Sequence, residues 1–212
     1  MHSLLDDFDL FIFDWDGTLS TSTALVRVSH FFKRRYNPQY IRRHLDEFRQ
    51  PKRIDAQFNA EQARAADFAY TIYTFFVRPR LREGAIEVLE TLKRKNKKVA
   101  LFSDGARQRV ENEVRNLGVE KYFDFIVSAQ TLNAYKPNPT GIEAAIREAS
   151  IRKARSLYLG DMAIDIFTAR FAKVKCCAIG NGLDPYDKLV ACKPDYIFQS
   201  THALLKSLGK EK

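Results

Sequence analysis

Short apolar runs alternate along most of this chain with stretches in which apolar residues recur every three or four positions. The apolar runs have the length of strands that are buried on both faces, and they lie at residues 9–13, 99–102, 125–127, 157–159, 174–179 and 196–198. The helical spacing covers residues 84–94, 106–117, 139–149, 162–172 and 201–208. This alternation predicts βαβ units, and therefore an α/β fold with a doubly wound parallel sheet.

Residues 20–80 interrupt this alternation, because their patterning is helical throughout. About 60 residues separate the first predicted strand from the first core helix, which is far longer than an ordinary connection. Apolar stripes within the segment include Leu25, Val28 and Phe32. We therefore expect an all-helical module at residues 20–80, inserted into an α/β core made of residues 1–19 and 81–212.

Positive charge is concentrated in the same inserted segment. The chain carries a formal net charge of +9, and residues 20–80 hold 12 Lys/Arg against 5 Asp/Glu. An excess of this kind favours anionic ligands. A second basic run, Lys93–Lys98, is a pattern also found in nucleic-acid-binding proteins. It ends a predicted helix, where cations complement the helix dipole, so we expect no nucleic-acid partner.

Composition and termini indicate an ordinary globular protein of the cytoplasm. No stretch approaches the roughly 20 apolar residues that cross a bilayer, and the N-terminus lacks the pattern of a secretory signal. The cysteines, Cys176, Cys177 and Cys192, fit neither a disulfide framework nor a metal spacing. We expect Cys176 and Cys177 to be core residues of a strand and expect no membrane partner. The sequence leaves the oligomeric state open.

Two acidic residues follow the first predicted strand directly. Asp14 lies at the carboxyl end of that strand, which faces the ligand crevice in an open parallel sheet. Asp16 comes two residues later, and Gly17 permits a tight turn that brings backbone amides close to a phosphoryl oxygen. Two carboxylates this close repel each other unless a cation or a shared proton is present. The segment therefore indicates a metal, or a division of roles between nucleophile and acid, although a plain polar turn is the alternative interpretation.

Polar residues also follow the later strands. Ser103 follows residues 99–102, Lys136 precedes a predicted helix, and Asp161 and Asp165 occupy a strand-to-helix turn. A lysine binds phosphate as a point charge, and carboxylate oxygens are the ligands that Mg²⁺ prefers. Each residue alone has an ordinary explanation as a helix cap or a surface charge. Together they would supply phosphate binders and metal ligands at one edge of the sheet.

In this order and on this pattern, the four segments resemble the haloacid dehalogenase (HAD) superfamily, in particular its phosphoglycolate phosphatase-like branch. That branch carries a helical cap directly after the first motif, in the position of residues 20–80. The resemblance implies that Asp14 attacks phosphorus to form an aspartyl-phosphate, while Asp16 protonates the leaving alcohol and later activates water. It implies a Mg²⁺ ion bound by Asp14, Asp16, Asp161 and Asp165. It implies a phosphate-binding set of Thr18, Ser103, Asp104 and Lys136, with Asp104 where the superfamily often has Asn.

The sequence thus predicts a Mg²⁺-dependent phosphatase that acts on a small anionic phosphorylated metabolite of unspecified identity. Dehalogenating and phosphonate-cleaving relatives do not use the second aspartate, so Asp16 argues against both. A phosphosugar mutase stays open, because it uses the same core residues and differs in passing the phosphoryl group to a sugar. The rival from another class is a non-catalytic binding protein that uses the basic cap. Retention of the whole set of site residues in one chain argues against it.

Overall fold

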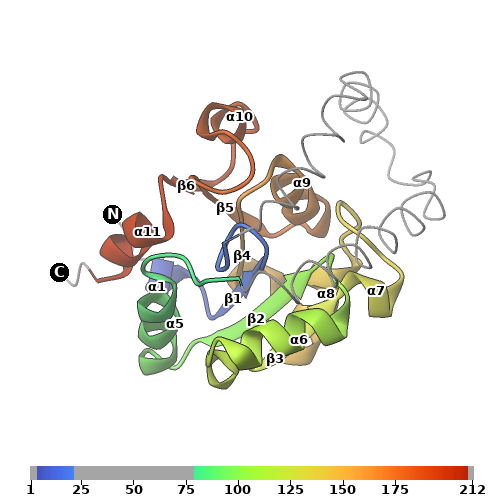
Figure 1. Cartoon of the computed structure of the whole chain (residues 1–212). Coiled ribbons are helices and arrows are strands. Elements are labelled where there is room, and N and C mark those ends of the chain that lie inside the picture. Colours follow the sequence, from blue (N-terminus) through green and yellow to red (C-terminus); the bar gives the residue numbers. More distant parts are fainter. Residues whose placement is uncertain (1–3, 22–78, 210–212) are drawn as a thin grey trace.

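The computed structural model describes residues 4–21 and 79–209. Its centre is a parallel sheet of six strands in the order β3-β2-β1-β4-β5-β6 (Figure 1). The strands are β1 (Leu10–Phe13), β2 (Lys98–Ser103), β3 (Phe125–Ser128), β4 (Ser156–Gly160), β5 (Lys175–Ile179) and β6 (Tyr196–Phe198). The predicted α/β class with a doubly wound parallel sheet is confirmed. Apart from the two ends of the segment, the predicted cap at residues 20–80 lies outside the described residues.

The strand order places the middle of the sheet at β1. This strand pairs in parallel with β2 on one side and with β4 on the other. The chain builds outward from β1 to β3 and then returns to the other side of β1 to begin β4. In an open sheet with this order, ligands bind at the carboxyl ends of the strands where the direction of winding reverses. The topology therefore marks the ends of β1 and β4 as the crevice.

Helices cover both faces of the sheet in the described part of the chain. They are α1 (Leu4–Asp7), α5 (Ala85–Arg94), α6 (Arg107–Asn116), α7 (Ala129–Leu132), α8 (Thr140–Ala149), α9 (Ala163–Ala172), α10 (Tyr186–Ala191) and α11 (Thr201–Leu208). Alternate residues of β1 point to opposite faces, as strand geometry requires. Phe11 and Phe13 pack in a core cluster with α5, α6 and α11, whereas Leu10 and Ile12 pack in a second cluster with α8 and α9.

Each of the six predicted strands and five predicted helices outside the insertion appears within one residue of its expected bounds. Three short helices were missed, namely α1, α7 and α10. They have four to six residues. A helix of one turn or slightly more cannot display the 3.6-residue repeat on which the prediction depends. Short 3₁₀ turns at Glu120–Tyr122 and Lys153–Arg155 complete the described elements.

The chain leaves and re-enters the core at adjacent points. The Thr21 amide donates to the Arg80 carbonyl at 2.7 Å, and the Arg80 amide donates to Thr21 Oγ1 at 3.0 Å. Ser20 forms isolated bridges with both Asp16 and Leu81. Thr21 and Arg80, near the two ends of the described segments, therefore lie beside the loop that follows β1.

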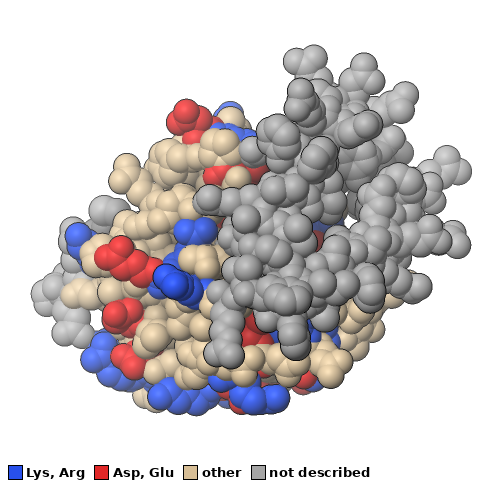
Figure 2. Space-filling view, viewed as in Figure 1, with Lys and Arg blue, Asp and Glu red and all other residues tan. Residues whose placement is uncertain are grey.

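The charged surface of the described residues shows no single large patch of one sign in the view of Figure 2. Three lysines of the basic run at Lys93–Lys98 form ion pairs with nearby aspartates: Lys93 lies 2.9 Å and Lys98 3.3 Å from Asp124 carboxylate oxygens, and Lys97 lies 3.1 Å from Asp9. These ion pairs agree with its interpretation as a helix end. Cys176 and Cys177 are buried in β5, as expected. None of the helices in the described part of the chain has the length and apolar character needed to cross a membrane.

Candidate active site

The loop after β1 is turned toward the end of β4. The Asp14 amide donates to the Leu159 carbonyl at 2.8 Å, which extends the pairing of the two strands beyond Phe13. Gly17 adopts a φ of 94°, in the left-handed region that favours glycine. A Cβ atom at Gly17 would lie 2.3 Å from Asp161 Oδ2. Glycine at this position therefore lets the loop approach Asp161 closely.

Three carboxylates meet at the carboxyl edge of the sheet. Asp14, Asp161 and Asp165 are buried, and each offers a carboxylate oxygen within 4.8 Å of the other two. Burial, followed by the charge of Asp165, raises the pKa of Asp161 to about 7. Burial also raises the pKa of Asp14 well above its usual range, although the charge of Lys136 acts against this. Three oxygen donors whose charged forms need compensation suit a hard divalent cation such as Mg²⁺.

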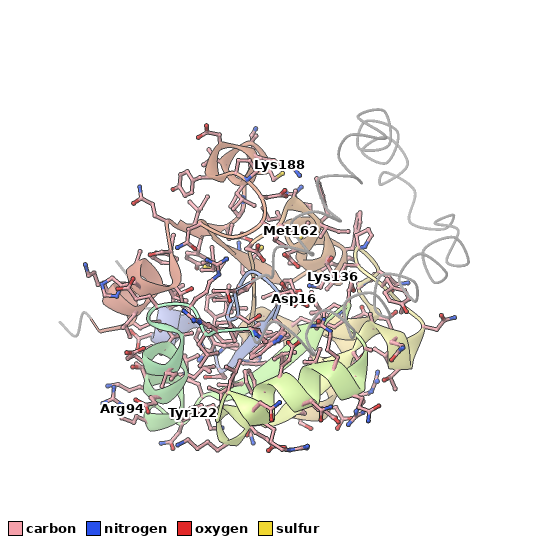
Figure 3. All side chains as sticks on the ribbon, in the orientation of Figure 1. Asp16, Arg94, Tyr122, Lys136, Met162 and Lys188 are labelled. Atoms are coloured by element: carbon pink, nitrogen blue, oxygen red, sulfur yellow. The ribbon has the colours of Figure 1, made fainter. Side chains whose placement is uncertain are left out.

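Lys136 supplies a positive charge to this cluster. Its Nζ donates to Asp14 Oδ1 at 2.5 Å and to Asp165 Oδ1 at 2.8 Å. Burial opposes the charged amine, but the charges of Asp14 and Asp165 outweigh burial and raise the pKa of Lys136 well above its usual range. The Lys136 side chain is therefore a fixed cation in contact with Asp14. Figure 3 shows Lys136 near Asp16 and Met162, far from Arg94 and Tyr122.

The structure also places the other predicted phosphate-binding residues near this edge. Thr18 Oγ1 lies 2.8 Å from Asp161 Oδ1 and 3.3 Å from Asp14 Oδ2, so its hydroxyl lies within hydrogen-bonding distance of both carboxylates. Ser103 ends β2 and is buried, and its Oγ accepts from the Gly105 amide at 3.0 Å. Asp104 Oδ1 accepts from the Lys136 amide at 3.0 Å. Asp104 thus anchors the segment that carries Lys136, and phosphate binding by these residues stays a prediction.

Asp16 points to a different partner from Asp14. Arg109 Nη1 donates to Asp16 Oδ1 at 3.1 Å and Arg109 Nη2 donates to Asp16 Oδ2 at 2.7 Å. Arg109 also contacts Glu113 at 3.2 Å, and Trp15 Nε1 donates to Glu113 Oε2 at 2.6 Å. Sequence reasoning missed Arg109 and Glu113. Their i, i+4 spacing on α6 was visible, but the same spacing is common in exposed ion pairs of helices.

A loop after β5 contributes to the site without any recognisable motif. The Leu183 amide donates to Asp161 Oδ2 at 2.5 Å, and a Cβ at Gly182 would lie 2.2 Å from the same oxygen. Asp184 accepts from the Ala163 amide at 2.8 Å, at the start of the helix that carries Asp165. The loop therefore holds the side chain of Asp161 and the first residue of α9. Sequence reasoning missed it because the contact joins segments 22 residues apart.

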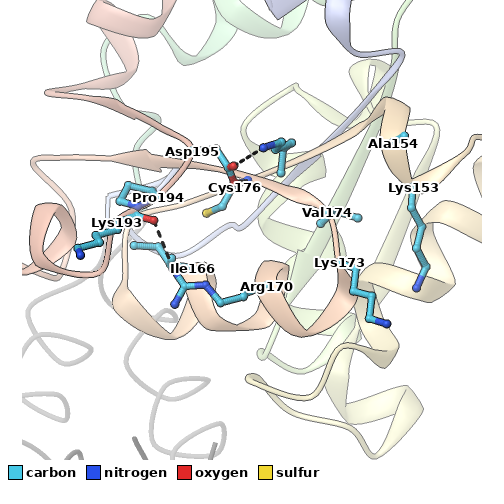
Figure 4. Close-up of a pocket in the computed structure, with 11 residues that line it drawn as sticks. Lys153, Ala154, Ile166, Arg170, Lys173, Val174, Cys176, Lys193, Pro194 and Asp195 are labelled. Atoms are coloured by element: carbon cyan, nitrogen blue, oxygen red, sulfur yellow. Dashed lines mark hydrogen bonds and ion pairs between the residues drawn. The ribbon is translucent and has the colours of Figure 1, made fainter. Parts of the chain in front are cut away.

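A hollow of about 520 Å³ lies elsewhere on the described surface (Figure 4). Its walls come from α9, from the start of β5 and from the residues that precede β4, β5 and β6, at the opposite edge of the sheet from Asp14. Several cations line it, but Lys175 pairs with Asp195 at 2.6 Å and Arg170 donates to the Cys192 carbonyl at 2.8 Å. None of the predicted site residues lines it. The hollow therefore adds nothing to the chemistry of the acidic cluster.

Comparison with known proteins gives one family match and several relatives. The model of the family described as haloacid dehalogenase-like hydrolase matches residues 11–179. The pyrophosphatase PpaX of Halalkalibacterium halodurans is 27% identical over 207 residues, which cover 93% of this chain and 95% of the relative. PpaX of Oceanobacillus iheyensis is 26% identical over 209 residues, again covering 93% of this chain and 95% of the relative.

Solved structures share the fold at lower identity. A predicted phosphoglycolate phosphatase from Haemophilus somnus superposes with a TM-score of 0.70 at 22% identity, covering 94% of this chain and 97% of the other. CbbY from Rhodobacter sphaeroides, solved in complex with phosphate, gives a TM-score of 0.69 at 20% identity, covering 95% of this chain and 99% of the other. At these identities the likeness bears on the fold alone.

Proposed function

Because this chain belongs to the haloacid dehalogenase-like hydrolase family and is one of its phosphatases, we propose that it hydrolyses a small phosphate monoester through an aspartyl-phosphate on Asp14. The observation that carries the proposal is the position of Asp14. Its carboxylate lies at the reversal point of the sheet, buried, in contact with Lys136 and beside two further carboxylates. A nucleophile in such a place is held rigidly and kept from bulk water.

The first step uses the charge arrangement around Asp14. An Asp14 oxygen attacks phosphorus, the bond from phosphorus to the leaving oxygen breaks, and Asp16 transfers its proton to that oxygen. Lys136 remains cationic next to Asp14 and compensates negative charge on the transferring phosphoryl group. Ser103, at the end of the adjacent strand β2, is the hydroxyl that we assign to a phosphoryl oxygen.

The second step returns the enzyme to its starting state. A water molecule attacks phosphorus, Asp16 accepts the proton of the water, and the bond from phosphorus to Asp14 breaks to release phosphate. Asp16 is only two residues from Asp14, so one carboxylate can serve both steps. Its side chain is more exposed than that of Asp14, 18% against 7%, as access to substrate and water requires.

The donor set suits Mg²⁺, and we propose that Asp14, Asp161 and Asp165 hold the ion together with the backbone carbonyl of Asp16. When bound, the ion would neutralise phosphoryl oxygens and favour attack by an anionic carboxylate. The three carboxylates are buried within 4.8 Å of one another with Lys136 in contact with two of them. When all three are ionised, Lys136 offsets one negative charge, and one divalent cation would balance the remaining two.

We assign residues 20–80 to an inserted helical cap, on the basis of their patterning and the paired ends at Thr21 and Arg80. The segment holds 12 Lys/Arg against 5 Asp/Glu, and its ends lie beside Asp16. We therefore propose that the substrate is a small metabolite with anionic groups besides its reacting phosphate. Phosphoglycolate is a monoester of this kind, and pyrophosphate is an anhydride that also carries extra negative charge; the names of similar proteins point to both.

Phosphate release with Mg²⁺ tests this function directly. The panel is pyrophosphate, 2-phosphoglycolate, glycerol phosphate and 4-nitrophenyl phosphate, each at low and high salt. We expect turnover of all four, a higher kcat/KM for the first two, and loss of that preference in high salt because screening weakens attraction between exposed charges. Equal kcat/KM values at every salt concentration would refute the assignment of the cap charge to specificity. Conversion of a hexose phosphate to its isomer, without phosphate release, would identify a mutase instead.

A further inference from the structure

We propose that Arg109 is a positioning residue that fixes the carboxylate of Asp16, and that Glu113 and Trp15 fix Arg109 in turn. This inference rests on the phosphatase activity proposed above, in which Asp16 is the acid–base residue that Arg109 contacts. Both nitrogens of the Arg109 fork meet both oxygens of Asp16, at 3.1 Å and 2.7 Å. A guanidinium that donates two parallel hydrogen bonds defines the orientation of a carboxylate plane as well as its position.

The Arg109–Asp16 pair is mostly buried, with Asp16 the more exposed partner. The Arg109 side chain is 7% exposed and that of Asp16 is 18% exposed. Arg107, on the same helix, pairs with Glu111 at 2.7 Å with its side chain 53% exposed. A surface pair such as Arg107–Glu111 contributes little to stability, whereas a pair that is mostly buried holds its geometry.

Glu113, itself held by Trp15, also anchors the guanidinium, through the Nη1 nitrogen that contacts Asp16. Glu113 accepts from Arg109 and from the indole N–H of Trp15, and its side chain is 6% exposed. Trp15 is fully buried, and it stands between Asp14 and Asp16 in the sequence. Trp15 contacts Glu113, which contacts Arg109, and Arg109 in turn contacts Asp16. Because Trp15 and Asp16 are neighbours in the sequence, these contacts form a closed ring that includes part of the loop carrying both aspartates. An Asp16 carboxylate within this ring cannot turn freely.

Gly105 shows that the neighbouring loop is shaped around the same guanidinium. A Cβ atom at Gly105 would lie 1.8 Å from Arg109 Nη2. Gly105 has no positive φ, so its backbone conformation alone does not require glycine. It lies two residues after Ser103, whose hydroxyl accepts from the Gly105 amide. Glycine at this position leaves room for Arg109 at the point where α6 meets the carboxyl edge of the sheet.

Positioning of Asp16 matters because this residue acts in both steps. It must give a proton to the leaving oxygen and later take one from water, and small misplacement of such a group has a large effect on rate. Loss of Arg109 should therefore impair proton transfer more than phosphoryl attack. That difference separates a positioning role from a merely structural one.

The test compares Arg109→Ala, Arg109→Lys and the control Arg107→Ala with glycerol phosphate and 4-nitrophenyl phosphate. Glycerol is a poor leaving group that needs the acid, whereas nitrophenolate leaves without it. We expect Arg109→Ala to lower kcat for glycerol phosphate by about 10²-fold, with KM changed by less than about threefold. With 4-nitrophenyl phosphate we expect a burst of one nitrophenolate per enzyme. Slow turnover should follow, because hydrolysis of the aspartyl-phosphate needs Asp16 to activate water. Arg109→Lys should restore little, because an ammonium group cannot donate the paired fork.

Arg107→Ala should match the parent on both substrates. An equal loss on both substrates without a burst, or full recovery in Arg109→Lys, would overturn the positioning role. Circular dichroism and a melting curve establish that each variant is folded. Gly105→Ala gives an independent displacement of the guanidinium, and it should reproduce the burst while leaving Arg109 in the chain.

A measurement without turnover keeps this inference separate from the proposed function. Trp15 is the single tryptophan of the chain, so intrinsic fluorescence reports on the ring directly. We expect Asp16→Asn to shift the emission of Trp15 in the parent and to have no such effect in Arg109→Ala. An equal shift in both backgrounds would show that Arg109 does not link the two residues. If the parent hydrolyses neither ester, the proposed function fails, and the fluorescence result still decides whether Arg109 holds Asp16.

Discussion

The ammonium group of Lys136 lies between the carboxylates of Asp14 and Asp165, with Nζ 2.5 Å from Asp14 Oδ1 and 2.8 Å from Asp165 Oδ1. The two aspartates come from different βα units, one after β1 and the other at the start of α9. A single buried cation thus joins the predicted nucleophile to a predicted metal ligand.

Asp14→Asn should abolish turnover while the protein stays folded. The amide keeps the shape of the side chain but is a poor nucleophile, so we expect kcat to fall on the order of 10³-fold or more. Phosphate release measures the turnover, and a melting curve measures whether the variant is folded. Asp187→Asn, an exposed change on α10, is the control for loss of one acid. Activity of folded Asp14→Asn near that of the parent would contradict the covalent mechanism.

Removal of metal should stop turnover, and Mg²⁺ should restore it. Because the ion would bind the folded state, we also expect Mg²⁺ to raise the melting temperature of the parent. Asp161→Asn removes one carboxylate from the cluster and should weaken both effects, whereas Ser103→Ala should lower activity with little change in the Mg²⁺-dependent melting shift. Ca²⁺ should support turnover poorly, since its coordination is looser. Full activity in excess chelator would exclude the metal site.

Gly17→Ala should damage the site more than it damages the fold elsewhere. The added Cβ would lie 2.3 Å from Asp161 Oδ2, at a φ of 94°. Gly118 has a φ of 71°, and no atom lies within 4 Å of the place that its Cβ would take, so Gly118→Ala imposes backbone strain alone. We expect both variants to lose about 1–3 kcal/mol of stability in urea titrations. Only Gly17→Ala should also lose Mg²⁺ binding and activity. Equal activity in the two variants would refute the close approach of Gly17 to Asp161.

Asp9 should contribute to stability at neutral pH and lose that contribution in acid. Hydrogen bonding to the Arg155 side chain, together with Lys97, lowers the pKa of Asp9 from 3.8 to about 2 against the cost of burial. A lowered folded pKa means that the contribution is complete above the unfolded pKa, near 4, and disappears as the pH falls through about 2. Urea midpoints of the parent and Asp9→Asn should therefore differ at pH 6 and converge between pH 4 and 2. Parallel curves over this range would show that the ion pair does not stabilise the fold.

Local sequence was sufficient to predict the six strands, the five longer helices of the described core and the main acidic residues at the carboxyl edge. A strand buried on both faces must be apolar throughout, and a helix that packs on a sheet must carry an apolar stripe, so β1 and α5 were visible in the sequence alone. The positions of Asp14, Ser103 and Asp161 followed from the rule that parallel strands place their carboxyl ends at one edge. The segment at residues 22–78 lies outside the described residues, so its predicted helical cap stays a prediction.

Tertiary structure alone decided which neighbours those residues have. Arg109 pairs with Asp16 across 93 positions, and the Leu183 amide reaches Asp161 across 22. Nothing in the local pattern distinguishes Arg109 from Arg107, yet one is buried against the loop after β1 and the other lies on the surface. Hydrophobic spacing specifies which face of an element is buried. It does not specify which element lies opposite, because that depends on the order in which the strands pair, and pairing joins residues that are distant in the chain.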